Sequence, residues 1–113
     1  MTIYNSALSG IPFTLQSLAT TGNGTPVVIP NSFTRHKITI KGNGAVGAGA
    51  IQVETADSPD YSGTWNPLGG GPITVVADSE LEYTFEGVFN ALRARISTTV
   101  TVGTVTVTYV GGK

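Results

Sequence analysis

The residues that most often carry chemistry in enzymes are few in this chain. It has one histidine, His36, and no cysteine, so a zinc site and a base–nucleophile pair both lack the side chains that they need. His36 falls on the same face of a predicted strand as Ile38 and Ile40, which indicates a strand residue near the end of a sheet. The sequence therefore predicts no catalytic centre and no cofactor.

Acidic residues form two local pairs that could act as paired carboxylates or bind a cation. Glu80 and Glu82 lie two apart in a predicted strand, so they point the same way onto a solvent face without the aromatic subsites of a glycosidase. Asp57 and Asp60 lie in a loop that lacks the regular spacing of a dedicated calcium loop. We expect no required metal, with calcium at Asp57 and Asp60 as the alternative.

The segment 58–65, Ser-Pro-Asp-Tyr-Ser-Gly-Thr-Trp, resembles the Asp-box hairpin motif, Ser-x-Asp-x-Gly-x-Thr-Trp, with the glycine displaced by one position. In families that carry the motif, it closes a turn and marks no active site. The resemblance implies that Asp60 caps the turn and that Trp65 belongs to the core. The alternative is a carbohydrate platform of Tyr61 and Trp65 exposed on this loop, because an amphipathic ring can serve either role.

Length and composition predict a single all-β domain. The chain has 113 residues, 12% of them charged, and a net charge of −1, which gives no attraction to nucleic acid or to an anionic membrane. It shows no membrane-spanning stretch and no secretory signal, so we expect synthesis in a cytoplasm. Low charge with abundant glycine and threonine is more usual in proteins that work outside cells. A virion component made in a host and released by lysis reconciles the two, as would a signal peptide that has been removed.

Alternation of apolar and polar residues predicts the strands. The clearest runs, rich in β-branched and aromatic residues, are 35–41, 50–55, 81–85, 91–96 and 104–109. The inward-facing side chains of these and neighbouring runs form the predicted core: Phe13, Val28, Ile38, Ile40, Ile51, Val53, Trp65, Val75, Leu81, Tyr83, Phe85, Leu92, Ile96, Val105 and Val107.

Turn signals complete the predicted architecture. Residues 12–19 and 26–29 indicate a hairpin around an Asn-Gly turn, with Pro26 and Pro30 placing its second strand at a sheet edge or keeping it short. The glycine-rich segment 42–49 precedes a strand and not a helix, so it indicates a flexible hairpin connection and not a phosphate-binding loop. We predict one jelly-roll-like β-sandwich of about eight antiparallel strands.

The sandwich is predicted to span residues 11–113, with an irregular N-terminal arm over residues 1–10. Basic residues concentrate on the polar faces of two predicted strands: Arg35, Lys37, Lys41, Arg93 and Arg95. Acidic residues line a third strand: Glu80, Glu82 and Glu86. Local cross-strand ion pairs are favoured, and separate complementary patches that steer assembly are the alternative.

Several segments together are similar to small β-sandwich structural proteins of tailed bacteriophages, with capsid decoration proteins as the nearest group. These segments are Gly-Thr-Trp-Asn-Pro-Leu at 63–68, Tyr-Thr-Phe-Glu-Gly at 83–87, Phe-Asn-Ala-Leu-Arg-Ala-Arg-Ile at 89–96 and Gly-Thr-Val-Thr-Val at 103–107. The resemblance covers roughly residues 20–110 and lies in the strand pattern. It implies a non-enzymatic virion protein on the outer capsid surface, a homo-oligomer such as a trimer, that binds and stabilises the major capsid protein lattice.

The alternative function is a carbohydrate-binding β-sandwich module or a phage adhesion component. Phe89, Arg93 and Arg95 are similar to the aromatic-Arg-Arg strand that ends discoidin-like modules. For the capsid role, we predict contact through the arm, whose apolar residues ten irregular positions can hardly bury by themselves, and through the glycine-rich segment. The predicted contact residues are Ile3, Tyr4, Leu8 and Val46.

Overall fold

The computed structural model describes residues 10–58, 61, 63–69 and 71–113. These residues form β-strands and turns, and they contain no helix that could cross a membrane. The strands in chain order are β1 (Phe13–Ala19), β2 (Val27–Val28), β3 (Arg35–Asn43), β4 (Ala50–Ala56), β5 (Asn66–Pro67), β6 (Ile73–Thr74), β7 (Glu80–Glu86), β8 (Ala91–Thr98) and β9 (Thr104–Gly112).

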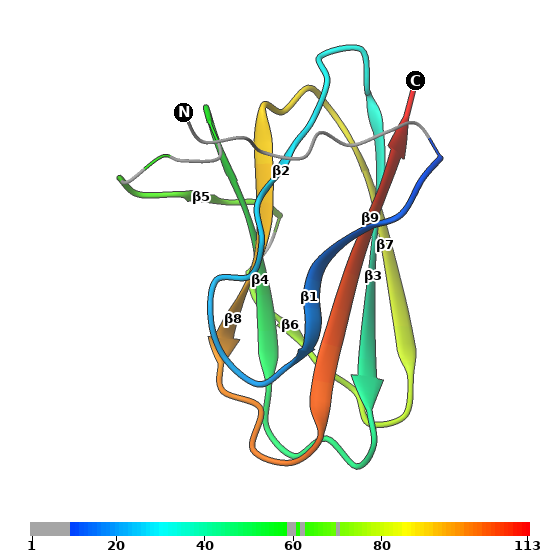
Figure 1. Ribbon diagram of the computed structural model, residues 1–113, viewed down its shortest axis with the longest axis vertical. Helices are drawn as coiled ribbons and strands as arrows, with labels where there is room; N and C mark the ends of the chain where they lie inside the picture. Colours follow the sequence, from blue (N-terminus) through cyan, green and yellow to red (C-terminus); the bar gives the residue numbers. More distant parts are fainter. Residues whose placement is uncertain (1–9, 59–60, 62, 70) are drawn as a thin grey trace.

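The strands form two antiparallel sheets that pack face to face (Figure 1). Sheet A has the order β2-β8-β4-β5, with β6 also paired to β4, and sheet B has the order β1-β9-β3-β7. Consecutive strands lie in opposite sheets, except that β4, β5 and β6 stay together in sheet A. This winding between two sheets confirms the predicted jelly-roll-like β-sandwich.

Both predicted hairpin connections are wrong, although the turns themselves are present. β1 pairs with β9 and β2 pairs with β8, so the chain between β1 and β2 crosses from one sheet to the other. The glycine-rich segment likewise joins β3 of sheet B to β4 of sheet A. A turn signal marks where the chain reverses, but the partner of each strand depends on residues far away in the sequence. The short edge strand predicted between two prolines is confirmed, because β2 has two residues and lies at the edge of sheet A.

The core lies between the sheets and is formed by the inward-facing side chains of both. Most of the predicted core is buried between the sheets: Ile38, Ile40, Ile51, Val53, Val75, Leu92, Ile96, Val105 and Val107. Trp65 is also buried, but outside this cluster. Further buried apolar residues complete the cluster: Leu15, Val27, Ile29, Phe33, Ala94, Val100 and Tyr109. The burial in β3 and β9 alternates with period two, as a half-buried sheet requires.

Two predicted core residues near the N-terminus are less buried than expected. Val28 is half-buried because the inward positions of this segment lie one residue away from the predicted one, so that Val27 and Ile29 face the core. Phe13 begins β1 at the edge of sheet B and is partly buried against the core.

The other exceptions lie on β7. Leu81 and Phe85 are half-buried, and Tyr83 is 41% exposed. Alternation placed them correctly on the inward face, but β7 is the edge strand of sheet B beyond β3. An edge strand has a neighbour on one side only, so its inward side chains are covered incompletely.

Candidate functional site

A buried carboxylate lies on the outer face of sheet A, where a solvated side chain would be expected. Glu54 of β4 stands directly opposite Arg93 of β8, and Arg95 is the next outward residue of β8. Arg93 Nε donates to Glu54 Oε1 at 2.9 Å, and Arg95 Nε lies 3.3 Å from Glu54 Oε2. The Glu54 side chain is only 8% exposed, so the two guanidinium groups supply the partners that a buried charge requires.

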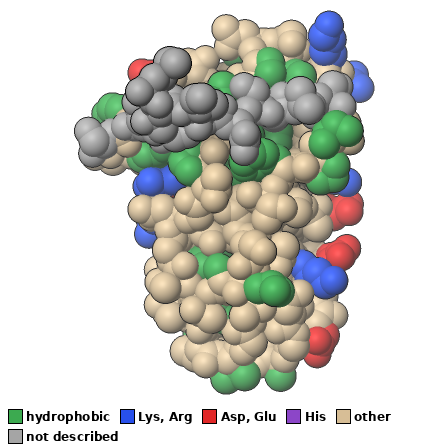
Figure 2. All heavy atoms as spheres, in the orientation of Figure 1, with side chains coloured by type: hydrophobic (Ala, Val, Ile, Leu, Met, Phe, Trp, Pro, Cys, Tyr) green, Lys and Arg blue, Asp and Glu red, His purple; other side chains and the backbone are tan. Residues whose placement is uncertain are grey.

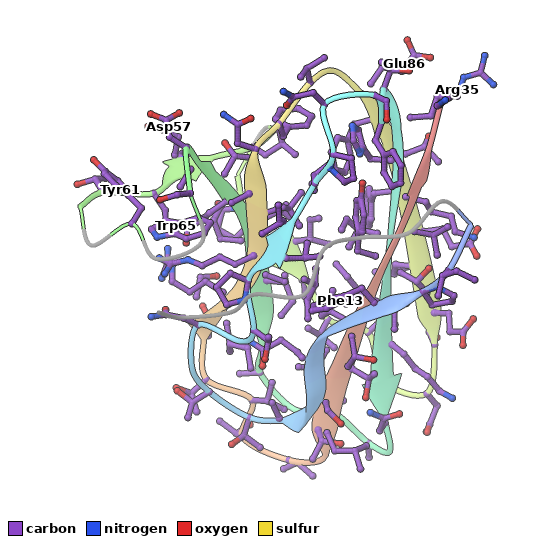
Figure 3. All side chains as sticks on the ribbon, turned by 45° about the horizontal axis from the view of Figure 1, so that its top comes forward. Phe13, Arg35, Asp57, Tyr61, Trp65 and Glu86 are labelled. Carbon is purple, nitrogen blue, oxygen red and sulfur yellow. The ribbon has the colours of Figure 1, made fainter. Side chains whose placement is uncertain are left out.

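The loop after β4 packs onto this cluster. Its tryptophan, Trp65, is 4% exposed, and the guanidinium carbon of Arg93 lies 4.4 Å from the centre of its ring, a cation–π contact. The indole N–H donates to the carbonyl oxygen of Tyr61 at 3.2 Å. In Figure 3, Trp65 lies close to the strands and Tyr61 farther out on the loop. Trp65 is therefore buried, but against the outer face of sheet A and apart from the cluster between the sheets.

This packing bears on the carbohydrate platform considered from the sequence. Tyr61 is 46% exposed, whereas the face of Trp65 is occupied by Arg93. A platform of both rings would require Trp65 to leave its contact with Arg93. Without that movement, Tyr61 is the exposed ring of this loop.

The possible calcium ligands lie in the same loop. Asp57 is exposed, and Asp60 lies outside the described residues. Within the described part of the chain, no three histidine or acidic side chains gather in a way that could hold a metal ion.

His36 is buried near the start of β3, and both of its ring nitrogens have partners. Nε2 lies 2.8 Å from the carbonyl oxygen of Gly87, which can only accept, so Nε2 carries the proton. Nδ1 then accepts from the hydroxyl of Tyr109 at 2.6 Å. Burial raises the pKa of Tyr109 to about 12, which keeps this donor protonated. Phe85 stacks on the imidazole with ring centroids 5.1 Å apart, so His36 joins β3, β7 and β9 at one end of sheet B, in agreement with its predicted place.

The predicted contact residue Val46 is partly buried against the core. Its loop is tied to the loop before β9, because Gly47 N–H donates to the Val102 carbonyl oxygen at 3.3 Å and Ala48 N–H to Thr101 Oγ1 at 3.0 Å. Exposed apolar side chains near this segment include Val102, at 55%, and Val76, at 45%. The other predicted contact residues lie outside the described residues: Ile3, Tyr4 and Leu8.

The outer face of sheet B carries adjacent basic and acidic rows. Basic residues of β3 lie beside acidic residues of β7, with Arg35 opposite Glu86 and Lys41 opposite Glu80. Figure 2 shows acidic and basic side chains close together along its right-hand margin. Lys37 and Glu82 lie 3.8 Å apart, with side chains 40% and 58% exposed, so this pair contributes little to stability. The local arrangement of charges, favoured from the sequence, is the one observed.

A pocket at the β7 edge was not predicted from the sequence. It has a volume of about 400 Å³ and is lined by Tyr83 and Phe85 of β7, by the segment around Ile73, and by the core residues Ile38 and Val53. It opens because β5 and β6 have only two residues each and cannot cover the seven residues of β7. The prolines and glycines of segment 67–72 were the available signal.

Comparison with known proteins gives one informative match. No family model and no curated protein sequence matches the chain. Among solved structures, the fold is similar to the crystal structure of the SPBc2 prophage-derived protein YomS, with a TM-score of 0.67 and 18% sequence identity over 90% of this chain and 92% of that one. The match shows that the two chains share one β-sandwich fold over nearly their whole lengths.

Proposed function

We propose that this chain is a non-enzymatic structural component of a bacteriophage particle, and that it decorates the outer capsid surface by binding the major capsid protein lattice. The observation that carries the proposal is the fold that the chain shares with a prophage-derived protein over 92% of that protein. A sandwich fold matched over 90% of this chain suits a small attachment module.

The hydrogen bonds and ion pairs of the buried ionisable groups support a non-enzymatic role. His36 uses both ring nitrogens in hydrogen bonds to Tyr109 and Gly87, and Glu54 is held by two arginines. A general base must be able to reach a substrate proton with a free lone pair. His36 and Glu54 are instead buried and engaged in contacts that hold strands and a loop together.

Decoration would rest on many weak contacts that act together. A homo-oligomer such as a trimer, assembled in the host cytoplasm, binds a repeating lattice through several equivalent surfaces, and each attached surface holds the others at high effective concentration. The protein would then stabilise the particle by bridging neighbouring capsid subunits. A carbohydrate-binding role through Tyr61, which is 46% exposed, is the competing function.

The test uses particles purified from the phage that encodes the chain. Quantitative mass spectrometry is expected to find the chain in many copies per particle, and the purified protein is expected to co-sediment with expanded heads but not with isolated tails. A Tyr61→Ala variant is expected to co-sediment equally well. Absence from particles, together with binding to a defined glycan that Tyr61→Ala abolishes, would contradict the proposal.

A further inference from the structure

β7 is a long and regular edge strand, and within the described residues its protection is a row of outward glutamates. Natural sheets shield their edges by short strands, bulges, prolines or charged side chains. Among the described strands, β2, β5 and β6 have two residues each, and the pairing of β1 with β9 is interrupted by two register shifts. β7 instead pairs with β3 over all seven of its residues without any shift.

The hydrogen bonds to β3 show which backbone groups of β7 point to the free edge. Gly87 N–H donates to the Thr34 carbonyl oxygen at 3.1 Å, and Gly42 N–H donates to the Ser79 carbonyl oxygen at 3.0 Å. Opposed residues of an antiparallel pair alternate between bonded and non-bonded, so the odd-numbered residues of this strand bond to β3. The peptide groups at the free edge therefore belong to Glu80, Glu82, Thr84 and Glu86.

The side chains of β7 divide into two chemically distinct rows along this edge. The carboxylates of Glu80, Glu82 and Glu86 lie on the outer face beside the basic residues of β3. The inward row includes Tyr83, which is 41% exposed, at the mouth of the 400 Å³ pocket that reaches Ile38 and Val53. An added strand would meet acidic groups on one face and an apolar opening on the other.

We propose that the free edge of β7 binds an extended segment of a partner protein, which adds to sheet B as a strand with lysine or arginine facing outward and apolar side chains facing inward. The main-chain groups of the edge supply hydrogen bonds, and the pocket receives an inward apolar side chain. β3 already satisfies this pattern on the other side of β7, because its outward residues include Arg35 and Lys41 and its inward residues include Ile38.

Charge disfavours a second copy of β7 as the occupant. Antiparallel pairing of two such edges about Tyr83 places Glu80 of one copy opposite Glu86 of the other, twice. Shifting the centre to residue 82 or 84 again sets glutamate against glutamate. Like charges directly opposite each other destabilise a strand pair, whereas a basic segment meets opposite charge at the same positions.

The inference does not depend on the virion role. Binding of a peptide tests the edge, and detection in particles tests the role, so either can fail alone. The probe is a fluorescent peptide with the sequence of residues 35–41, Arg-His-Lys-Ile-Thr-Ile-Lys, titrated with the full chain and followed by anisotropy. Its matched control carries glutamate at the three basic positions.

We expect saturable binding of the basic peptide that weakens as salt rises, because exposed charges are screened. The acidic control is expected to bind at least about tenfold more weakly. Thr84→Pro removes one free-edge N–H and spares the bonds to β3, so it is expected to weaken binding at least about tenfold. Thr84→Val keeps that N–H and is expected to bind like the unmodified chain.

Circular dichroism and thermal melting establish that each variant is folded. If Thr84→Pro does not fold, Glu82→Lys supplies the same test through charge and is expected to weaken the basic peptide and strengthen the acidic one. The proposal is overturned if the basic peptide does not bind, if it binds folded Thr84→Pro as tightly as the unmodified chain, or if its affinity is unchanged in Glu82→Lys.

Discussion

The substitution Arg93→Met is expected to destabilise the protein through a single buried interaction. Methionine keeps an unbranched apolar stem against Trp65 but removes the guanidinium that donates to Glu54 at 2.9 Å. The Arg93 and Glu54 side chains are 16% and 8% exposed, and breaking such a buried pair by removing one partner costs about 3–5 kcal/mol. Because Arg95 still lies 3.3 Å from Glu54 and remains a partner for the carboxylate, we expect a loss at the lower end of this range, about 3 kcal/mol.

A double-mutant cycle with Glu54→Gln separates the ion pair from the packing. Urea unfolding of both single variants and the double variant is followed by far-ultraviolet circular dichroism and by the fluorescence of Trp65, the only tryptophan. The coupling energy between residues 54 and 93 is expected to be about 1.5–3 kcal/mol. The matched control is the exposed pair Lys37 and Glu82, for which Lys37→Met and Glu82→Gln should show coupling below about 1 kcal/mol.

Salt gives an independent check, because it screens exposed pairs strongly and buried pairs much less. The coupling of Glu54 with Arg93 should persist at high salt, while that of Lys37 with Glu82 should vanish. Equal coupling energies for the two pairs would mean that Glu54 is hydrated and that the loop bearing Trp65 does not pack on the sheet, which would refute the reasoning.

Three further predictions concern burial and backbone geometry. The contribution of Tyr109 to stability is expected to be constant up to about pH 10 and to fall between pH 10 and about 12, because the unfolded phenol ionises near its ordinary pKa of 10.0 while the buried one keeps its proton until about 12. Urea unfolding across this range should show a smaller fall in Tyr109→Phe, and an identical fall in both proteins would speak against the burial argument. Trp65→Ala should cost about 3–5 kcal/mol, and the native emission of Trp65 should be blue-shifted; emission typical of a hydrated indole would show that the ring is exposed. Gly103→Ala should lower the melting temperature more than Gly44→Ala. Both glycines have positive φ, but a Cβ at Gly103 would lie 2.5 Å from the Asn43 carbonyl oxygen, whereas one at Gly44 would meet nothing within 4 Å. Equal losses in parallel thermal melts would mean that φ strain alone matters.

His36, at the end of sheet B where β3, β7 and β9 meet, shows which features of a residue could be predicted from the sequence. The isolation of His36 from cysteine and from other histidines was visible in the sequence, and it correctly indicated a strand residue near a sheet end. Its hydrogen bond to Tyr109, 73 positions away, was not visible, because the pairing of β3 with β9 brings them together.

Glu54 illustrates a second limit. Alternation placed Glu54 on the polar face of its strand, while its neighbour Val53 points to the core. Side chains on that polar face are usually exposed to solvent. The loop after β4 folds back over the sheet and its tryptophan packs on Arg93, so the carboxylate is buried on the outside of the sandwich. The position at which a loop packs depends on which side chains lie on the sheet surface after the strands have paired.

By itself, the sequence determined the fold class, most strand positions and the face on which most strand residues lie, because period-two alternation is a local property of the pleated backbone. Only the tertiary structure decided which strands are neighbours, since pairing joins segments that are distant in the chain. That decision placed β7 at an edge and left Tyr83 41% exposed on an inward face. The same residues in a central strand would have been core, so the candidate binding edge exists through the order of the strands and not through their composition.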